Sequence, residues 1–133
     1  MTHTAVLSLG SNWGDREKAV SDALSLIQRQ LGETVHSDIY FTPAVNGKGP
    51  DYANCVAAVY TTLGAEAIRL LTKQMETEAG RTPERRERGE VPLDIDLVIF
   101  DGDVLRPADF TRKYFYRGLL QISQQTEYST YKL

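Results

Sequence analysis

The 133-residue sequence has little of what secreted, membrane-spanning and nucleic-acid-binding proteins usually carry. It contains one cysteine, Cys55, which cannot form a disulfide within the chain, so we expect a reducing cytoplasmic environment. No apolar run approaches the ~18 residues of a membrane helix, and the first residues lack a signal peptide's basic start and apolar core. The net charge is −3, which argues against general nucleic-acid binding.

The composition that remains is that of a globular protein with one domain, residues 1–133. Hydrophobic residues make up 41% and charged residues 25%, and a chain of this length buries enough surface to fold without disulfides or metals. Residues 1–66 hold four basic and seven acidic side chains, whereas residues 67–133 hold eleven of each. We expect a monomer that binds small molecules.

Hydrophobic periodicity predicts an alternation of strands and helices. Short apolar or alternating runs predict strands at 4–9, 34–41, 52–62 and 93–100. Apolar residues spaced by three and four predict one helix that ends at Gly32 and another between Gly64 and Gly80. The order β-α-β-β-α-β predicts a ferredoxin-like α+β fold, a mainly antiparallel sheet with two helices on one face.

Two further segments carry weaker signals. The stretch 81–91 has almost no apolar residues, so we expect an exposed loop. Asp101-Gly102-Asp103 predicts a turn, followed by a short return strand near Val104. Beyond Gly118 the chain is rich in glutamine, serine and threonine, and we expect the last ten residues to be poorly ordered.

Two aspartates, Asp94 and Asp96, interrupt the most apolar predicted strand. Side chains at i and i+2 of a strand point the same way, about 6–7 Å apart. Two acids on one face repel each other and lose hydration, and Mg²⁺ relieves both effects because it binds carboxylate and phosphate oxygens. Such a pair can hold two ions ~3.5–4 Å apart for phosphoryl transfer. The alternative is a solvated strand face.

Four arginines precede this strand closely, namely Arg81, Arg85, Arg86 and Arg88. Guanidinium groups bind phosphate through several donors in one plane, and together with a metal they stabilise a polyphosphate during transfer. Three glutamates interleave with these arginines, so the alternative is a solvated loop whose charges pair with one another.

Several short motifs occur in one order along the chain: Leu9-Gly10-Ser11-Asn12, Thr42-Pro43, Asp51-Tyr52-Ala53-Asn54, Glu76, Gly80-Arg81 and Leu93-Asp94-Ile95-Asp96-Leu97. Together they resemble the 6-hydroxymethyl-7,8-dihydropterin pyrophosphokinase family, from about residue 4 to residue 120. The resemblance implies a ferredoxin-like fold and a role in folate biosynthesis. It also implies transfer of pyrophosphate from Mg-ATP to the pterin hydroxymethyl oxygen, with release of AMP.

The resemblance further implies roles for individual residues. Asp94 and Asp96 would hold two Mg²⁺ ions and, with Arg81, form the catalytic set. The expected ATP contacts are Glu76, Arg81, Arg86, Arg88, Arg112 and Arg117. The expected pterin contacts are Thr42, Pro43, Val45, Tyr52 and Asn54. Because Tyr52 and Asn54 are two residues apart on a strand, they pair an aromatic surface with an amide; ordinary strand packing is their alternative.

The chain also departs from the family pattern. Val91 stands where a catalytic arginine is expected, and Leu119 replaces the second aromatic residue that would contact the pterin. The family's histidine after the last strand is absent, and the chain ends earlier than typical members. A second hypothesis is therefore a catalytically impaired relative that binds a nucleotide, a pterin or a protein partner.

Overall fold

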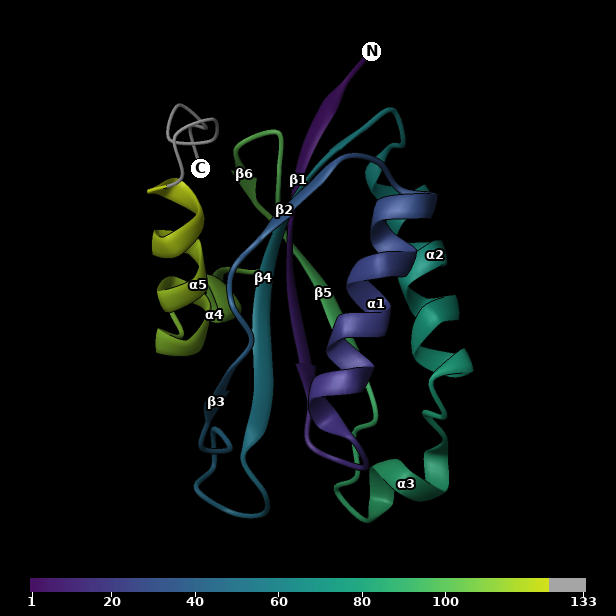
Figure 1. The fold of residues 1–133 in the computed structure, drawn as a ribbon, viewed down its shortest axis with the longest axis vertical. Coiled ribbons are helices and arrows are strands. Elements are labelled where there is room, and N and C mark those ends of the chain that lie inside the picture. Colours follow the sequence, from purple (N-terminus) through teal and green to yellow (C-terminus); the bar gives the residue numbers. More distant parts are fainter. Residues whose placement is uncertain (125–133) are drawn as a thin grey trace.

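The structure is a computed structural model, and it describes residues 1–124 (Figure 1). Within these residues one antiparallel sheet is formed by β1 His3–Ser11, β2 Thr34–His36, β3 Tyr40–Thr42, β4 Tyr52–Thr61, β5 Asp94–Phe100 and β6 Asp103–Val104. The helices are α1 Arg16–Gln30, α2 Ala65–Glu78, α3 Pro83–Glu87, α4 Pro107–Phe110 and α5 Lys113–Ser123. The predicted α+β fold is confirmed. Most of the last ten residues, for which we expected poor order, lie outside the described residues.

The two long helices begin and end where the sequence predicts. The Asp15 side chain accepts a hydrogen bond from the Lys18 N–H at 3.2 Å and caps the start of α1. The chain leaves this helix through Gly32, whose φ of +147° suits glycine. Both helices bury an apolar stripe, which includes Ile27 of α1 and Ile68 of α2.

The strands run in the order β2-β4-β1-β5-β6, with β3 pairing a different part of β4. Strand β1 therefore lies in the middle, antiparallel to both β4 and β5. Helices α1 and α2 cover one face of the sheet, and α4 and α5 lie on the other (Figure 1). We call these the closed face and the open face.

Helix α5 was not predicted. The sequence analysis expected two helices only and noted the polar composition beyond Gly118, a segment whose first residues lie in α5. Phe115, Gly118 and Ile122 recur at helical spacing and are buried against the sheet. A β-carbon on Gly118 would lie 2.4 Å from Val56 Cγ2, so glycine permits this close approach. The open face thus carries a second, smaller core beside Val56 and Val98.

Two segment predictions were wrong. The expected strand 34–41 is divided at Ser37, whose N–H still donates to the Val56 carbonyl at 2.9 Å but whose hydroxyl accepts the Val56 N–H at 3.0 Å. The expected loop 81–91 contains α3, which Thr82 caps by accepting the Arg85 N–H at 3.2 Å and which Pro83 begins. The return strand near Val104 is confirmed as β6. No helix of the described part is long and apolar enough to cross a bilayer.

Candidate active site

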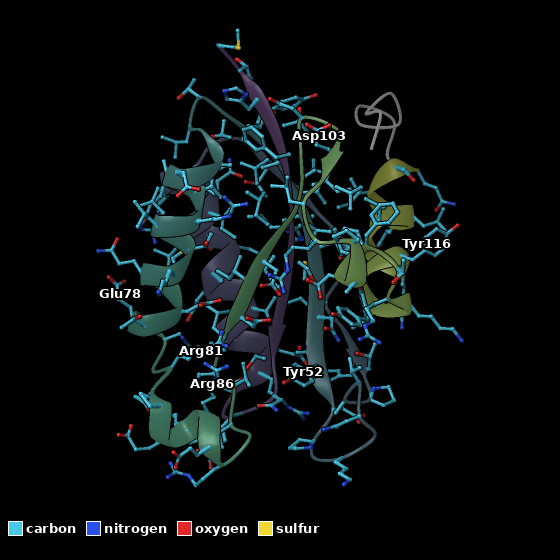
Figure 2. All side chains as sticks on the ribbon, turned by 180° about the vertical axis from the view of Figure 1, so that it is seen from behind. Tyr52, Glu78, Arg81, Arg86, Asp103 and Tyr116 are labelled. Carbon is cyan, nitrogen blue, oxygen red and sulfur yellow. The ribbon has the colours of Figure 1, made fainter. Side chains whose placement is uncertain are left out.

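A cavity of about 560 Å³ lies over the part of the open face that α5 leaves uncovered. Its walls come from the end of β1, the loop after β3, the start of β4, the loop before β5, and α5. The volume falls within the ~300–1,000 Å³ range of small-molecule sites. Figure 2 shows Tyr52 and Arg81 at this end of the molecule, and Asp103 at the other end.

The five residues expected to contact a pterin come together here: Thr42, Pro43, Val45, Tyr52 and Asn54 all line the cavity. The buried Asn54 amide nitrogen donates to the hydroxyl of Thr42 and, at 3.2 Å, to the carbonyl of Tyr52. These two bonds hold the amide plane between β3 and β4. The arrangement therefore combines an aromatic ring, an amide and apolar groups, as recognition of a flat heterocycle requires.

Asp94 and Asp96 line the same cavity, opposite Tyr52 and Asn54 across β1. Burial, and then the neighbouring Asp94 carboxylate, raise the pKa of Asp96 to about 7. Arg81 pairs with Asp94 at 2.8 Å, whereas Arg106 lies 3.8 Å from Asp96, so Asp96 is the less compensated of the two carboxylates. The pair thus has the electrostatic properties of a site completed by a positive charge.

The donor set fits a magnesium ion. In the part of the chain that the structure describes, no third histidine, cysteine, aspartate or glutamate joins this pair to complete a cage made only of protein groups. Mg²⁺ is commonly bound by one or two carboxylates together with water and substrate phosphates. The carboxylates of Asp94 and Asp96 therefore suit a metal that arrives with a polyphosphate.

Arg81 connects the acid pair to the closed side of the sheet. Its Nη1 atom donates to Asp94 Oδ1 at 2.8 Å and lies 3.3 Å from Glu76 Oε2. The same Glu76 oxygen accepts the Ile95 N–H at 2.7 Å, and burial raises the pKa of Glu76 while this bond opposes the rise. Glu76 is not among the residues that line the cavity, so its contacts act on Arg81 and β5.

The remaining arginines expected near ATP are dispersed. Arg88 lines the cavity, and its guanidinium pairs with Glu90 at 3.2 Å. Arg86 lies on α3, and Arg112 precedes the first turn of α5. Arg117 stacks on the Tyr40 ring, with 4.4 Å from the guanidinium carbon to the ring centroid. These last three do not line the cavity.

The sequence reasoning missed Arg106, which lies on the other side of the acid pair. Its Nε atom is 3.8 Å from Asp96 Oδ1 and also pairs with Asp109. The turn at 101–103 and the return strand near Val104, both predicted from the sequence, could have indicated this contact. Val104 pairs with Ile99, so continuing the chain by two residues brings position 106 towards Asp96.

Asn12 was also missed, although it belongs to the first motif. Its backbone N–H donates to the Val91 carbonyl at 2.9 Å, and its side chain accepts the Val91 N–H at 2.6 Å. The amide nitrogen donates to the Gly89 carbonyl at 2.9 Å. Asn12 thus holds the loop that carries Arg88, and Val91 presents an apolar side chain to the cavity.

Aromatic residues near α5 have divided roles. Phe115 is fully buried in the second core, and Phe110 packs against it. Tyr114 lines the cavity, and its backbone carbonyl accepts a bond from the hydroxyl of Tyr40. Tyr116 is exposed and lies on the outer side of α5 in Figure 2. The aromatic group that α5 supplies to the cavity is therefore Tyr114.

Comparison with known proteins gives a consistent result. Residues 6–124 match the family model described as 7,8-dihydro-6-hydroxymethylpterin-pyrophosphokinase (HPPK). The 2-amino-4-hydroxy-6-hydroxymethyldihydropteridine pyrophosphokinase of Bacillus subtilis is 32% identical, over 96% of this chain and 82% of the relative. The enzyme of that name from Porphyromonas gingivalis is 35% identical, over 70% of this chain and 66% of the relative.

A plant protein shares the same region. The mitochondrial folate synthesis bifunctional protein of Pisum sativum is 33% identical, over 71% of this chain and 19% of its own length. The family match covers nearly all of the described residues, including both sides of the cavity. The chain therefore belongs to the 7,8-dihydro-6-hydroxymethylpterin-pyrophosphokinase family.

Proposed function

We propose that this protein transfers a pyrophosphoryl group from ATP to the hydroxymethyl oxygen of 6-hydroxymethyl-7,8-dihydropterin. The observation that carries the proposal is one cavity, in a chain of this family, that joins an acid pair to an aromatic and amide surface. The hydroxymethyl oxygen bonds to the β-phosphorus of ATP as the bond from that phosphorus to the α,β-bridging oxygen breaks. AMP leaves with that oxygen, and the hydroxyl proton passes to water.

The pterin occupies the part of the cavity that is lined by residues of β3 and β4. The Tyr52 ring stacks on the flat heterocycle, and Asn54 supplies a hydrogen-bonding group at its polar edge. Thr42, Pro43 and Val45 close the side of this subsite. Stacking of aromatic pairs contributes about 0.5–1.5 kcal/mol beyond area burial, so Tyr52 orients the substrate as well as retaining it.

The phosphates of ATP occupy the part of the cavity near β5. Arg88 lines the cavity, whereas Arg81 does not line it and is held against Asp94, which does. In the proposed complex both arginines supply positive charge to the polyphosphate. Asp94 and Asp96 would hold Mg²⁺, two ions in the proposed nucleotide complex, which would supply neutralisation of the phosphate charge. Glu76 keeps the Arg81 guanidinium close to Asp94 through the contacts described above. Arg86, Arg112 and Arg117 complete the proposed ATP contacts only if their side chains reorient towards the nucleotide.

Val91 supports a second candidate function. An apolar side chain lines the cavity where the family pattern predicts an arginine. In related phosphoryl transfer, one supplied arginine is worth about 10³–10⁵ in rate. A relative that binds pterin or nucleotide without efficient turnover is therefore the alternative.

Product analysis separates these possibilities. The protein is mixed with 6-hydroxymethyl-7,8-dihydropterin, ATP and Mg²⁺, and the nucleotides and pterins are separated by chromatography. We expect AMP and pterin pyrophosphate in equal amounts. ADP would contradict pyrophosphoryl transfer, and AMP without pterin pyrophosphate would indicate hydrolysis. Pterin binding without any product would favour the alternative.

A further inference from the structure

The loop 43–51, which joins β3 to β4, is long for a hairpin connection and forms much of the cavity wall. Hairpin loops commonly have about two to five residues, whereas this loop has nine, and seven of the nine line the cavity. Within the loop, the Gly47 N–H donates to the Ala44 carbonyl at 2.8 Å and the Lys48 N–H donates to Asn46 Oδ1 at 2.9 Å. These bonds shape the loop without tying it to the rest of the protein, so its position depends on how its ends are held.

Arg16, the first residue of α1, contacts both ends of this loop. Its guanidinium carbon lies 4.7 Å from the centroid of the Phe41 ring, on the strand that leads into the loop. Its Nη1 atom donates to the backbone carbonyl of Asp51, the last loop residue, at 2.8 Å. Arg16, Phe41 and Asp51 are not among the residues that line the cavity. The Arg16 side chain therefore joins the two ends of the loop from outside the cavity.

The local structure of α1 does not account for an arginine at this position. The helix dipole disfavours a positive charge in the first turn of a helix, and Asp15 already caps this one. The Arg16 side chain is half-buried, and its contacts with Phe41 and Asp51 offset the conformational entropy that a long side chain loses when it is ordered. The contacts of Arg16 thus concern the loop and not the helix.

A similar arrangement holds the loop on the nucleotide side. Arg85 donates to the Gly80 carbonyl at 3.1 Å and to the Glu90 carboxylate at 3.4 Å, which joins the two ends of the segment that contains α3. Its guanidinium carbon lies 3.9 Å from the centroid of the Trp13 ring. The start of α1 lies at the same end of the molecule as α3 and the loop between β3 and β4 (Figure 1). Trp13 and Arg16 therefore each contact a different loop of the cavity.

We propose that Arg16 is a positioning residue for the pterin: it holds the loop 43–51 in the arrangement that binds this substrate. The inference rests on the proposed function. Without Arg16 the loop spends only part of its time in that arrangement, and the apparent affinity for the pterin falls by the same fraction. The KM for the pterin should therefore depend on Arg16 more strongly than the KM for ATP does.

The kinetic test compares Arg16→Gln with Arg29→Gln. Arg29 is exposed in the last turn of the same helix, so its replacement removes the same charge far from the loop. We expect Arg16→Gln to raise the KM for the pterin about tenfold, which corresponds to about 1.4 kcal/mol, and to leave kcat and the KM for ATP within about threefold. Arg16→Lys, which keeps the charge and one donor group, should lie between the wild type and Arg16→Gln. Arg29→Gln should change none of these values.

Trp13→Leu should give the opposite result. It removes the ring on which Arg85 stacks and leaves the contacts of Arg16 in place. We expect the KM for ATP to rise by about threefold or more and the KM for the pterin to stay at the wild-type value. A rise in the pterin KM alone would contradict the separate action of the two contacts.

Pterin binding and hydrogen exchange measure the loop without turnover. The Kd for 6-hydroxymethyl-7,8-dihydropterin is measured by calorimetry with Mg²⁺ and an ATP analogue in which a methylene group replaces the α,β-bridging oxygen. In Arg16→Gln this Kd should rise about tenfold, and the amides of Gly47 and Lys48 should exchange faster. The thermal midpoint should stay within about 3 °C of the wild type, because Arg16 contributes little to the stability of α1.

A double-mutant cycle tests whether Arg16 acts through the Phe41 ring. Phe41→Leu removes the ring and leaves the bond to Asp51, so the pterin Kd should rise only about threefold. The variant that carries both Phe41→Leu and Arg16→Gln should bind the pterin as Arg16→Gln does. Effects that multiply independently would overturn the inference.

The outcomes also separate this inference from the proposed function. If the wild type forms AMP and pterin pyrophosphate and Arg16→Gln keeps the wild-type KM for the pterin, the inference is wrong and the proposed function stands. If the wild type binds the pterin without forming product, the proposed function fails and the Kd comparison decides the inference. A rise in both KM values together with a marked fall in the thermal midpoint would show a general structural role and overturn the inference.

Discussion

The two faces of the sheet are made by the same strands and have opposite properties. On β1, Leu7 is buried in the closed-face core, whereas Ser8 and Gly10 line the cavity. On β5, Leu97 packs into the closed face while Asp96 lines the cavity. Because side chains alternate along a strand, adjacent residues serve packing and ligand binding separately. Substitutions on the two faces should therefore affect different measurements.

The largest expected effect is on the acid pair of the open face. Replacing both acids, Asp94→Asn with Asp96→Asn, should lower turnover by at least ~10³-fold, because preorganised charge at a phosphoryl-transfer site is worth about that much. Mg²⁺-dependent ATP binding, measured by calorimetry, should be lost. Thermal stability should change little, because the double change removes the repulsion between the two carboxylates together with the Asp94–Arg81 ion pair.

Asp103→Asn is the matched control for this change. Asp103 is an exposed acid on β6, at the end of the sheet away from the cavity. It should leave turnover and ATP binding unchanged. Equal Mg²⁺-dependent ATP binding in the double variant and the wild type would remove the acid pair from the proposed site.

Two neighbouring residues of β1 should respond differently to substitution, because they lie on opposite faces of the sheet. Leu7 is 0% exposed in the closed-face core, so Leu7→Ala should lower the free energy of unfolding by about 2–5 kcal/mol. Ser8→Ala should change it by less than about 1 kcal/mol, because a hydroxyl facing a cavity contributes little packing. Urea denaturation of both variants measures the difference. Similar losses at the two positions would show that the faces are not separate in function.

Two neighbouring residues of β4 also lie on opposite faces of the sheet, and the reactivity of one of them can be measured. Asn54 lines the cavity, whereas Cys55 is fully buried in the closed-face core. Burial raises the pKa of the Cys55 thiol to about 11, and its hydrogen bonds with the hydroxyl and the backbone carbonyl of Ser37 oppose the rise. At about pH 8 the native thiol should therefore react with iodoacetamide about 100-fold more slowly than the unfolded thiol.

The sign of the accompanying stability change follows from the raised pKa. Above its ordinary pKa the unfolded thiol loses its proton first, so the unfolded state binds fewer protons than the native state. The contribution of Cys55 to stability is present below about pH 9 and is lost as the pH rises towards 11. Because Cys55 is the single cysteine, alkylation reports on it alone. Equal rates in native and unfolded protein would contradict burial of this thiol.

The smallest expected effect concerns the loop at the margin of the open face. Asn12→Ala removes the side-chain bonds to Gly89 and Val91 that hold this loop. Loosening the loop that carries Arg88 should raise the KM for ATP about tenfold. A tenfold change corresponds to about 1.4 kcal/mol, which is the size of one lost hydrogen bond to a charged or buried group. The KM for the pterin should change less, and hydrogen exchange at 89–91 should accelerate.

Asn12→Asp is the informative comparison for this variant. It keeps an acceptor for the Val91 N–H and loses the donor to the Gly89 carbonyl. Its KM for ATP should lie between those of the wild type and Asn12→Ala. An unchanged KM for ATP in Asn12→Ala would show that the loop contributes nothing to nucleotide binding.

Local sequence patterns predicted the long strands, the two long helices and the placement of Asp94 and Asp96 on one face, whereas the segment 34–41 is divided into β2 and β3. Local periodicity is sufficient for these, because alternation along a strand and spacing along a helix do not depend on distant residues. It also placed Tyr52 beside Asn54 on β4. Helix α5 was missed because Gln121 and Ser123, and the polar sequence that follows them, obscured a short apolar stripe at Phe115, Gly118 and Ile122.

Only the tertiary structure decided which distant groups meet. The arginine next to Asp96 is Arg106, brought back by the β5–β6 hairpin, whereas Arg117 stacks on Tyr40 outside the cavity lining. Likewise, Gly10 lies between Asn54 and Asp94 because β1 pairs with both β4 and β5. Long cationic side chains reach many partners, and strand order is set by global packing. Neither is encoded in the local pattern around a residue.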